Sequence, residues 1–154
     1  MINSQLEEPV AIARRLRRRH LLCGWWFLTG FILLGIALES LHGFKVSWYL
    51  DPAFETRRLL WRLAHAHGTL LSLIQLGFAA AISEAPPTTT SLRTTSTMLL
   101  LAGLLLPFGF FLGGVTIYGG DPGPGIFLVP IGAFLLLVAV FRVAWHVTFQ
   151  RNDT

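Results

Sequence analysis

Residues 21–41, LLCGWWFLTGFILLGIALESL, form an apolar run with a single charged residue, Glu39. Three more long apolar runs follow, at residues 59–82, 98–118 and 125–149. Each is close to the roughly 20 residues that an α-helix needs to cross a bilayer. Of the 154 residues, 53% are hydrophobic and 13% charged, which is more apolar surface than a soluble domain of this length can bury. The sequence therefore predicts an all-α fold in one integral membrane domain, residues 1–154, built as a bundle of four transmembrane helices.

The basic residues predict how this bundle is oriented. Five arginines lie between Arg14 and Arg19, directly before the first run, and the positive-inside rule makes this end cytoplasmic. Four crossings then return the C-terminus to the cytoplasm as well. The same segment accounts for the net charge of +4 through contact with an anionic lipid surface. We therefore predict the lipid bilayer, and no nucleic acid, as a partner, in the inner (cytoplasmic) membrane of a bacterial-type cell.

The segments outside the four runs add detail to this topology. Pro9, followed by helix formers and arginines, predicts a short amphipathic N-terminal helix on the inner membrane surface. The first connection carries Trp48 and Tyr49, which are typical of an outer membrane interface. SEAPPTTTSLRTTST at 83–97 is expected to be a polar cytoplasmic loop. GGDPGPG at 119–125 predicts a tight outer turn that makes the last two helices antiparallel neighbours.

The second run, residues 59–82, contains two histidines in a segment expected to lie in hydrocarbon. Polar groups are expensive there and tend to be functional. At 100° per residue, one face carries His65 and nearly every other polar group of the run, namely Arg62, Gly68, Thr69, Ser72 and Gln75. His67 lies on the opposite, apolar side. A polar stripe in lipid faces protein, a cofactor or water, so His65 is the candidate functional histidine.

The depth of His65 limits the groups that can share a site with it. The helix runs inward from the outer end, so the end of the first helix, with Glu39 and His42, lies at a similar level, as does the outer half of the third. Glu39 and Arg62 are natural partners for an ion pair near this interface. Arg142 and His146 lie at the cytoplasmic end of the last helix, where we expect them to snorkel toward the headgroups.

Several roles are open to a buried imidazole at this level. It can hydrogen-bond to a neighbouring helix. A zinc or copper site needs three or four ligands at one depth, and His42, His65 and Glu39 would supply a poor one. Haem needs only one histidine and a setting of glycines and aromatic rings. PFGFFLGG at 107–114 offers such a setting, although its glycine spacing equally favours helix–helix packing.

Several stretches of the chain resemble the styrene oxide isomerase family, which consists of small four-helix membrane proteins. The similarity follows the order and spacing of RRRHLLCG (17–24), GIALESLHGFKVSWYL (35–50) and WRLAHAHG (61–68). It continues more weakly through PFGFFLGG and DPGPGIFLVPIGA (121–133), and so covers most of residues 19–135. The resemblance implies a homo-oligomer that binds haem b near its subunit contacts through one histidine of the second helix. By position that iron ligand is His65.

The resemblance also implies a reaction, the Meinwald rearrangement of an aryl epoxide to an aldehyde, with ferric haem as Lewis acid. We therefore expect an epoxide isomerase that acts on a small apolar epoxide. His65 would bind the iron, and Gly68, Thr69, Gly109 and Gly113 would line the haem b pocket. The asparagine and tyrosine with which the family orients the epoxide are replaced here. The matching positions are Leu71, with Ser72 beside it, and Phe111, with Tyr118 two turns further on. The candidate catalytic residues are therefore Ser72, Phe111 and Tyr118.

Two other functions remain open at this point. An electron-transfer cytochrome b would need a second axial ligand at the same depth, and His42 is the candidate. A haem-free accessory membrane subunit would use His65 only to hydrogen-bond to a neighbouring helix.

Overall fold

The computed structural model describes residues 2–82 and 89–149, and the side chains of 8–82 and 90–149. The described residues form five α-helices, two 3₁₀ helices (η) and one two-stranded hairpin. In chain order these are α1 (Ile2–Gly43), α2 (Ser47–Leu50), η1 (Pro52–Phe54), α3 (Glu55–Ala81), α4 (Thr89–Val115), β1 (Ile117–Tyr118), β2 (Asp121–Pro122), η2 (Pro124–Phe127) and α5 (Leu128–Phe149).

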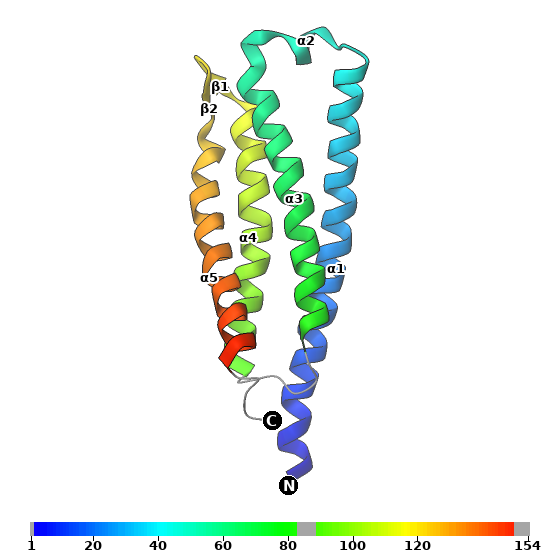
Figure 1. Ribbon diagram of the computed structural model, residues 1–154, viewed down its shortest axis with the longest axis vertical. Helices are drawn as coiled ribbons and strands as arrows, with labels where there is room; N and C mark the ends of the chain where they lie inside the picture. Colours follow the sequence, from blue (N-terminus) through cyan, green and yellow to red (C-terminus); the bar gives the residue numbers. More distant parts are fainter. Residues whose placement is uncertain (1, 83–88, 150–154) are drawn as a thin grey trace.

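The four long helices lie side by side, and each packs against the next in chain order. α1 also contacts α4, so that α3 has α1 on one side and α4 on the other. The start of α1 and the end of α5 lie at one end of the bundle, which we call the inner end. α2 and the β1–β2 hairpin lie at the other, which we call the outer end (Figure 1). The prediction of an all-α fold is confirmed.

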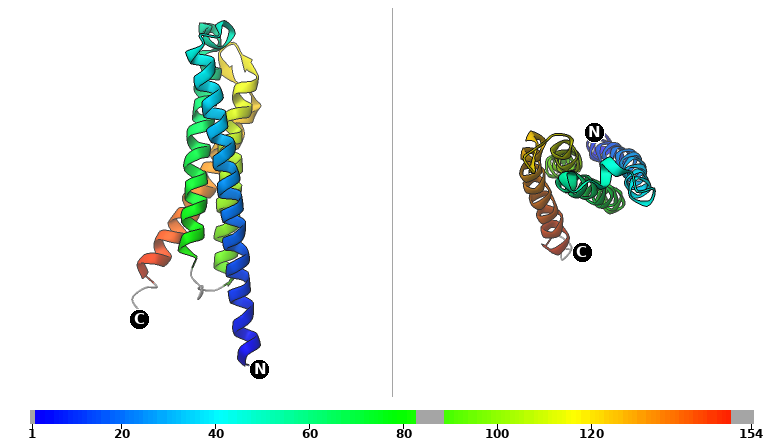
Figure 2. Two further views of the ribbon diagram at one scale, coloured as in Figure 1. Left: turned by 90° about the vertical axis from the view of Figure 1, so that its right-hand side faces the viewer. Right: turned by 90° about the horizontal axis from the view of Figure 1, so that it is seen from above.

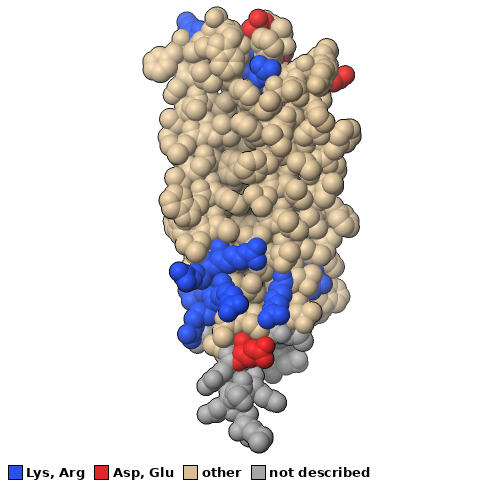
Figure 3. All heavy atoms as spheres, turned by 180° about the vertical axis from the view of Figure 1, so that it is seen from behind, with Lys and Arg blue, Asp and Glu red and all other residues tan. Residues whose placement is uncertain are grey.

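Three helical segments are long and apolar enough to cross a membrane: Glu8–Gly43, Thr90–Val115 and Pro124–Phe149. Their large apolar side chains are widely exposed, as in Trp26 of α1 and Phe134 of α5. On the face shown in Figure 3 the charged side chains gather at the two ends and leave an uncharged belt between them. α3 is as long as α4, at 27 residues each, but its histidines and Gln75 make it less apolar.

The prediction of a separate amphipathic N-terminal helix is wrong, because residues 2–43 form one continuous helix of 42 residues. At 1.5 Å per residue α1 is about 63 Å long, roughly twice the hydrocarbon thickness. The helix formers after Pro9 provide no break, so the segment continues directly into the first apolar run. The N-terminal part of α1 nevertheless has a buried face and a polar face, because Ala13 and His20 are buried whereas Arg14 and Arg18 are exposed.

The predicted polar loop at 83–97 is also only partly correct. Residues 83–88 lie outside the described part, but residues 89–97 are the first turns of α4. Their hydroxyls hydrogen-bond within the helix: Thr94 to the Thr90 carbonyl, Thr95 to that of Ser91, and Thr97 to that of Arg93, at 2.9–3.0 Å. Such bonds satisfy the hydroxyls without breaking the helix.

The outer turn at 119–125 is confirmed. Ile117–Tyr118 pairs with Asp121–Pro122, and the two residues between them, Gly119 and Gly120, have positive φ angles of 58° and 97°. A two-residue hairpin favours this backbone conformation, which glycine adopts without strain. The hairpin leads into η2 and α5, which return antiparallel along α4 as predicted.

Glycines bring α1 and α3 into close contact. A β-carbon on Gly35 would lie 2.7 Å from Nδ1 of His65, and one on Gly24 would lie 2.7 Å from Cδ2 of Leu76. Gly68 of α3 receives the ring of Phe31 from α1 in the same way. Side chains of each helix therefore fill glycine sockets in the other, the small-residue packing that holds helices together in lipid.

A buried polar network joins three helices near the inner end. His20 of α1 is fully buried and hydrogen-bonds through Nδ1 to Oε1 of Gln75 in α3, and through Nε2, at 2.8 Å, to the hydroxyl of Ser96 in α4. The Gln75 amide nitrogen donates to the Leu99 carbonyl at 2.7 Å. Because Gln75 Oε1 accepts, His20 is assigned as the tautomer protonated at Nδ1, and Ser96 donates to Nε2. Every group in the network is paired, which a low-dielectric interior requires.

Gly103 makes this network sterically feasible. A β-carbon there would lie 2.8 Å from Nε2 of Gln75. The glycine thus leaves the amide room to reach the carbonyl of Leu99.

Gln75→Leu is expected to lower the free energy of unfolding by about 1–3 kcal/mol, because it leaves the buried Nδ1–H of His20 without a partner. Unfolding of the detergent-solubilised protein would measure the change. The control is Thr97→Ala, which removes an exposed hydroxyl bonded only to its own helix and should change stability by at most about 0.5 kcal/mol. Equal effects of the two substitutions would contradict this role of the network.

Candidate functional site

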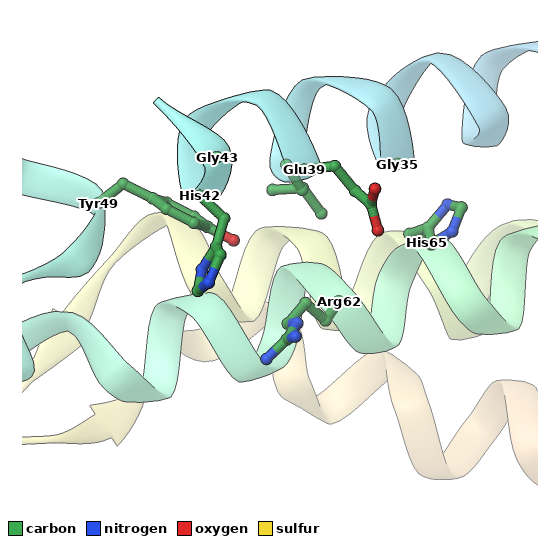
Figure 4. A pocket seen from close by; sticks show the side chains of 8 residues that line it. Gly35, Glu39, His42, Gly43, Tyr49, Arg62 and His65 are labelled. Atoms are coloured by element: carbon green, nitrogen blue, oxygen red, sulfur yellow. The ribbon is translucent and has the colours of Figure 1, made fainter. Parts of the chain in front are cut away.

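A pocket of about 370 Å³ opens between α1 and α3 near the outer end. It lies at the level predicted for a site at His65, and Figure 4 shows the side chains that line it. Most come from the last three turns of α1 and the first turns of α3, and one comes from α2. The lining residues are Gly35, Leu38, Glu39, His42, Gly43, Tyr49, Arg62 and His65.

The imidazole of His65 is held by α1 on two sides. Its Nδ1 lies 2.7 Å from the carbonyl oxygen of Phe31, which can only accept, so Nδ1 carries the proton and donates it. The ring lies against the backbone of Gly35, where a β-carbon would collide with it. Nε2 has no hydrogen-bond partner among the described residues and is left with its lone pair. An imidazole whose other N–H is fixed by a carbonyl is the usual form of a metal-ligating histidine.

His67 lies in a different environment, as the helical period predicts. Its Nδ1 donates to the Leu63 carbonyl one turn back in α3, at 2.9 Å, and its ring lies 4.9 Å from that of Phe110 in α4. His67 therefore packs on α4, whereas His65 faces α1 and the pocket. The two histidines do not share a site.

Ionisable groups gather on the outer side of the pocket. Glu39 and His42 extend from α1, and Arg62 lies on α3 one turn outward from His65 (Figure 4). The carboxylate of Glu39 is directed toward the His65 side, and the guanidinium of Arg62 points toward the outer end. Glu39 and Arg62 both line the pocket, but no ion pair between them is present in the described structure.

Tyr49 closes the outer end of the pocket. It is 2% exposed, and its hydroxyl is directed into the pocket (Figure 4). Arg58 fixes the backbone around it by donating from Nη1 to the carbonyls of Tyr49 and Asp51, both at 2.8 Å. The short helix α2 thus supplies a firmly held phenol, a hydrogen-bond donor that lies outside the second apolar run.

The rest of the predicted polar stripe lies along α3 outside the pocket, with Gly68, Ser72 and Gln75 buried and Thr69 half-buried. Gly68 holds the Phe31 ring, and the Ser72 hydroxyl donates to the Gly68 carbonyl at 2.7 Å. The hydroxyl oxygen of Thr69 is buried without a partner among the described residues. Gln75 belongs to the inner network. Gly68, Ser72 and Gln75 therefore face protein, which is one of the three surroundings expected for the stripe, and only His65 and Arg62 line the pocket.

The predicted residues of the third helix lie away from His65. Gly109 and Gly113 bring α4 close to α5 and η2, where β-carbons would meet Val129 and Ile126. The structure thus places both glycines in helix–helix contacts, which is the alternative that their spacing also predicted. Leu71, the position matched to the family's asparagine, is buried at 2% exposure.

The two aromatic candidates also have other contacts. The ring of Phe111 stacks on Trp61 at 5.8 Å, and its carbonyl accepts from the indole nitrogen of Trp61 at 3.2 Å. Tyr118 is 67% exposed in the outer hairpin. Within one chain, therefore, Ser72, Phe111 and Tyr118 are not brought together with His65.

Of the α1 residues in the pocket, Glu39 and His42 were expected at the level of His65, whereas Gly35 was not, although the sequence carries a signal for it. Gly35, Glu39 and His42 are spaced i, i+4 and i+7, so they share one helix face. Gly35 is the least obvious of them, because its role is to leave space for the ring of another residue.

The described residues contain no group of three or more His, Cys, Asp or Glu side chains placed to hold a metal ion. A haem iron would need only one protein ligand. No protein-family model, curated protein or solved structure matches the chain.

Gly35→Ala is expected to displace the His65 ring and break its hydrogen bond to Phe31, because the new methyl group would occupy the position of the ring. Nitrogen NMR of histidine-labelled protein in detergent would show the loss of the protonated Nδ1 signal of His65. Gly30→Ala is the matched control on the same helix, since a β-carbon there meets nothing within 4 Å. An unchanged His65 signal in Gly35→Ala would show that the ring is not held in this way.

Proposed function

We propose that the protein is an integral membrane protein in which α3 crosses the bilayer together with the three more apolar helices. α3 lies between α1 and α4 along the bundle. Its most polar interior groups, Ser72 and Gln75, are buried, whereas Leu59, Leu70 and Leu73 are exposed. A helix that turns its polar groups into the bundle can cross lipid at lower mean hydropathy.

In the proposed orientation both termini lie on the cytoplasmic side of a bacterial-type inner membrane. The exposed arginines from Arg14 to Arg19 support it, because they form the basic cluster at the end of the bundle where α1 starts (Figure 3). The positive-inside rule favours the cytoplasm for such a cluster.

Reporter cysteines on either side of α3 test this topology directly. In a Cys23→Ser background, we expect Ala53→Cys to react with a membrane-impermeant maleimide on intact spheroplasts. Arg93→Cys should react only after permeabilisation. Both positions are exposed on the molecule. Labelling of both in intact cells would show that α3 does not span, and the reverse pattern would reverse the orientation.

For the site we propose a haem b pocket with His65 as the iron ligand. The observation that carries the proposal is the state of the His65 imidazole. Its Nδ1–H is fixed on the Phe31 carbonyl, and Nε2 has no hydrogen-bond partner among the described residues, beside a pocket of about 370 Å³. The guanidinium of Arg62 and the ring N–H of His42 lie at the outer side of the pocket, where they can donate hydrogen bonds to the two propionate groups of haem b. The open side of the pocket would be closed by a second copy of the chain, as the family resemblance implies.

The activity that we propose for this site is isomerisation of a small apolar aryl epoxide to an aldehyde. A bound ferric haem would supply a Lewis acid for the epoxide oxygen. In the substrate the benzylic C–O bond opens, and a hydride moves from the oxygen-bearing carbon to the electron-poor benzylic carbon. The product is the aldehyde, and no electrons enter or leave. Leu38 and the ring of Tyr49 would be the apolar surfaces of the pocket that keep water from the electron-poor carbon.

The residues that orient the epoxide are expected to differ from the family pattern. The hydroxyl of Ser72 is engaged with its own helix, and Phe111 has no donor in its side chain. Tyr49 is the phenol that lines the pocket with His65, and we propose that its hydroxyl donates to the epoxide oxygen.

A second candidate function is electron transfer by a cytochrome b with two axial histidines. The observation that favours it is that His42 lines the same pocket as His65. In this alternative the pocket would take no substrate.

Visible spectra of the purified protein and two histidine variants separate these functions. We expect a Soret band in the wild type that is lost in His65→Ala and kept in His42→Ala, with conversion of styrene oxide to phenylacetaldehyde by the oxidised protein. Tyr49→Phe should keep the Soret band and lower the rate about tenfold or more, as loss of one positioned donor does.

Any other combination of spectra and activity points to a different conclusion. Loss of the Soret band in either histidine variant would favour the cytochrome. A Soret band without aldehyde would refute the epoxide activity alone. Absence of haem from wild-type protein expressed with a haem supply would refute the cofactor and favour a haem-free accessory membrane subunit.

A further inference from the structure

A second pocket, of about 90 Å³, lies near the inner end of the bundle, a long way from His65. Its walls come from the end of α3, the start of α4 and the end of α5. α5 packs mainly on α4 and leans away from the rest of the bundle toward its C-terminal end (Figure 2). The divergence leaves a groove between α3 and α5 with α4 as its floor. Phe78 and Ile82 form part of its apolar walls.

The polar part of this groove is built around Arg142. The side chain does not snorkel outward as expected but reaches across to α4, where Nε donates to the Thr95 hydroxyl at 3.1 Å and Nη2 to the Ser91 hydroxyl at 3.0 Å. Thr95 in turn donates to the Ser91 carbonyl at 3.0 Å. His146, one turn further along α5, lines the same pocket. The guanidinium is thus held in a fixed orientation by neutral partners.

These hydroxyls orient the positive charge without neutralising it. Nη1 has no hydrogen-bond partner in the described part of the chain. The acidic side chains that the structure describes lie elsewhere: Glu8 in the first turns of α1, and Glu39, Asp51, Glu55 and Asp121 toward the outer end. A half-buried, preoriented guanidinium favours a planar or tetrahedral oxyanion that can accept two of its N–H groups.

We propose that this groove binds one anionic phospholipid, with the headgroup phosphate on Arg142 and His146 and the acyl chains along the walls between α3 and α5. The combination of a cationic end and apolar walls matches such an amphiphile. The location agrees, because the basic cluster of α1 lies at the same end of the molecule (Figure 3), where lipid headgroups of a cytoplasmic leaflet would be. The site is independent of haem and of the epoxide activity.

Native mass spectrometry of the whole protein in detergent, with equal amounts of phosphatidylglycerol and phosphatidylcholine, tests the proposal. We expect wild-type protein to retain one phosphatidylglycerol in preference to phosphatidylcholine. Arg142→Gln should weaken that binding about tenfold, as expected for loss of a charge-assisted hydrogen bond. Arg93→Gln is the matched control, because it removes an exposed arginine of α4 at the same end that does not line the groove.

Arg142→Lys provides a second variant that keeps the charge and is less disturbing to the α4–α5 contact. It should weaken binding by a smaller factor, because an ammonium group keeps the positive charge but cannot offer the parallel N–H donors of a guanidinium group. Equal losses in Arg142→Gln and Arg93→Gln would mean unspecific attraction and overturn the proposal. Unchanged binding in both Arg142 variants would overturn it as well and leave Arg142 as an interhelical clamp. Displacement of the lipid by millimolar glycerol phosphate would identify a free-phosphate site instead.

Discussion

The close approach of α1 and α3 through glycine sockets is the constraint on which the rest of the structure depends. Lipid provides no hydrophobic drive for apolar helices to associate, so they must fit at short range. Phe31 enters at Gly68, His65 at Gly35 and Leu76 at Gly24. This contact brings the Phe31 carbonyl to the His65 imidazole and sets the width of the outer pocket. The packing that stabilises the bundle and the geometry of the candidate site are therefore one feature.

The interior contains polar groups at two levels with different properties. Near the inner end His20, Gln75 and Ser96 pair completely with one another and with backbone, so they act as a structural clamp. Near the outer end, Nε2 of His65 has no hydrogen-bond partner in the described part of the chain, and Tyr49 directs its hydroxyl into the pocket. An incompletely paired polar group in an apolar interior is costly, and this contrast between the two histidines is why we propose the haem site at His65 and not at His20.

Much of the candidate site was predictable because α-helices have a fixed period. The 3.6-residue repeat separated His65 from His67. The rise of 1.5 Å per residue along two antiparallel helices placed Glu39 and His42 near the depth of His65. What it did not reveal is how each hydroxyl or glycine would be used. Ser72 bonds to its own helix and Gly109 supports the α4–α5 contact, because local hydrogen bonds and small-residue packing compete with ligand binding for the same residue types.

The sequence by itself determined the helical fold class, the apolar segments and the outer turn. It also determined that His65 and His67 lie on different faces of α3, since all of these follow from hydropathy, turn residues and helical period along one chain. Only the tertiary structure decided that α1 is continuous through its arginines, that α4 begins among the threonines, and that Tyr49 and Gly35 belong to the pocket. It also turned Arg142 from the membrane surface toward α4. These features depend on contacts between residues far apart in the chain, whose partners become known only when the helices are packed.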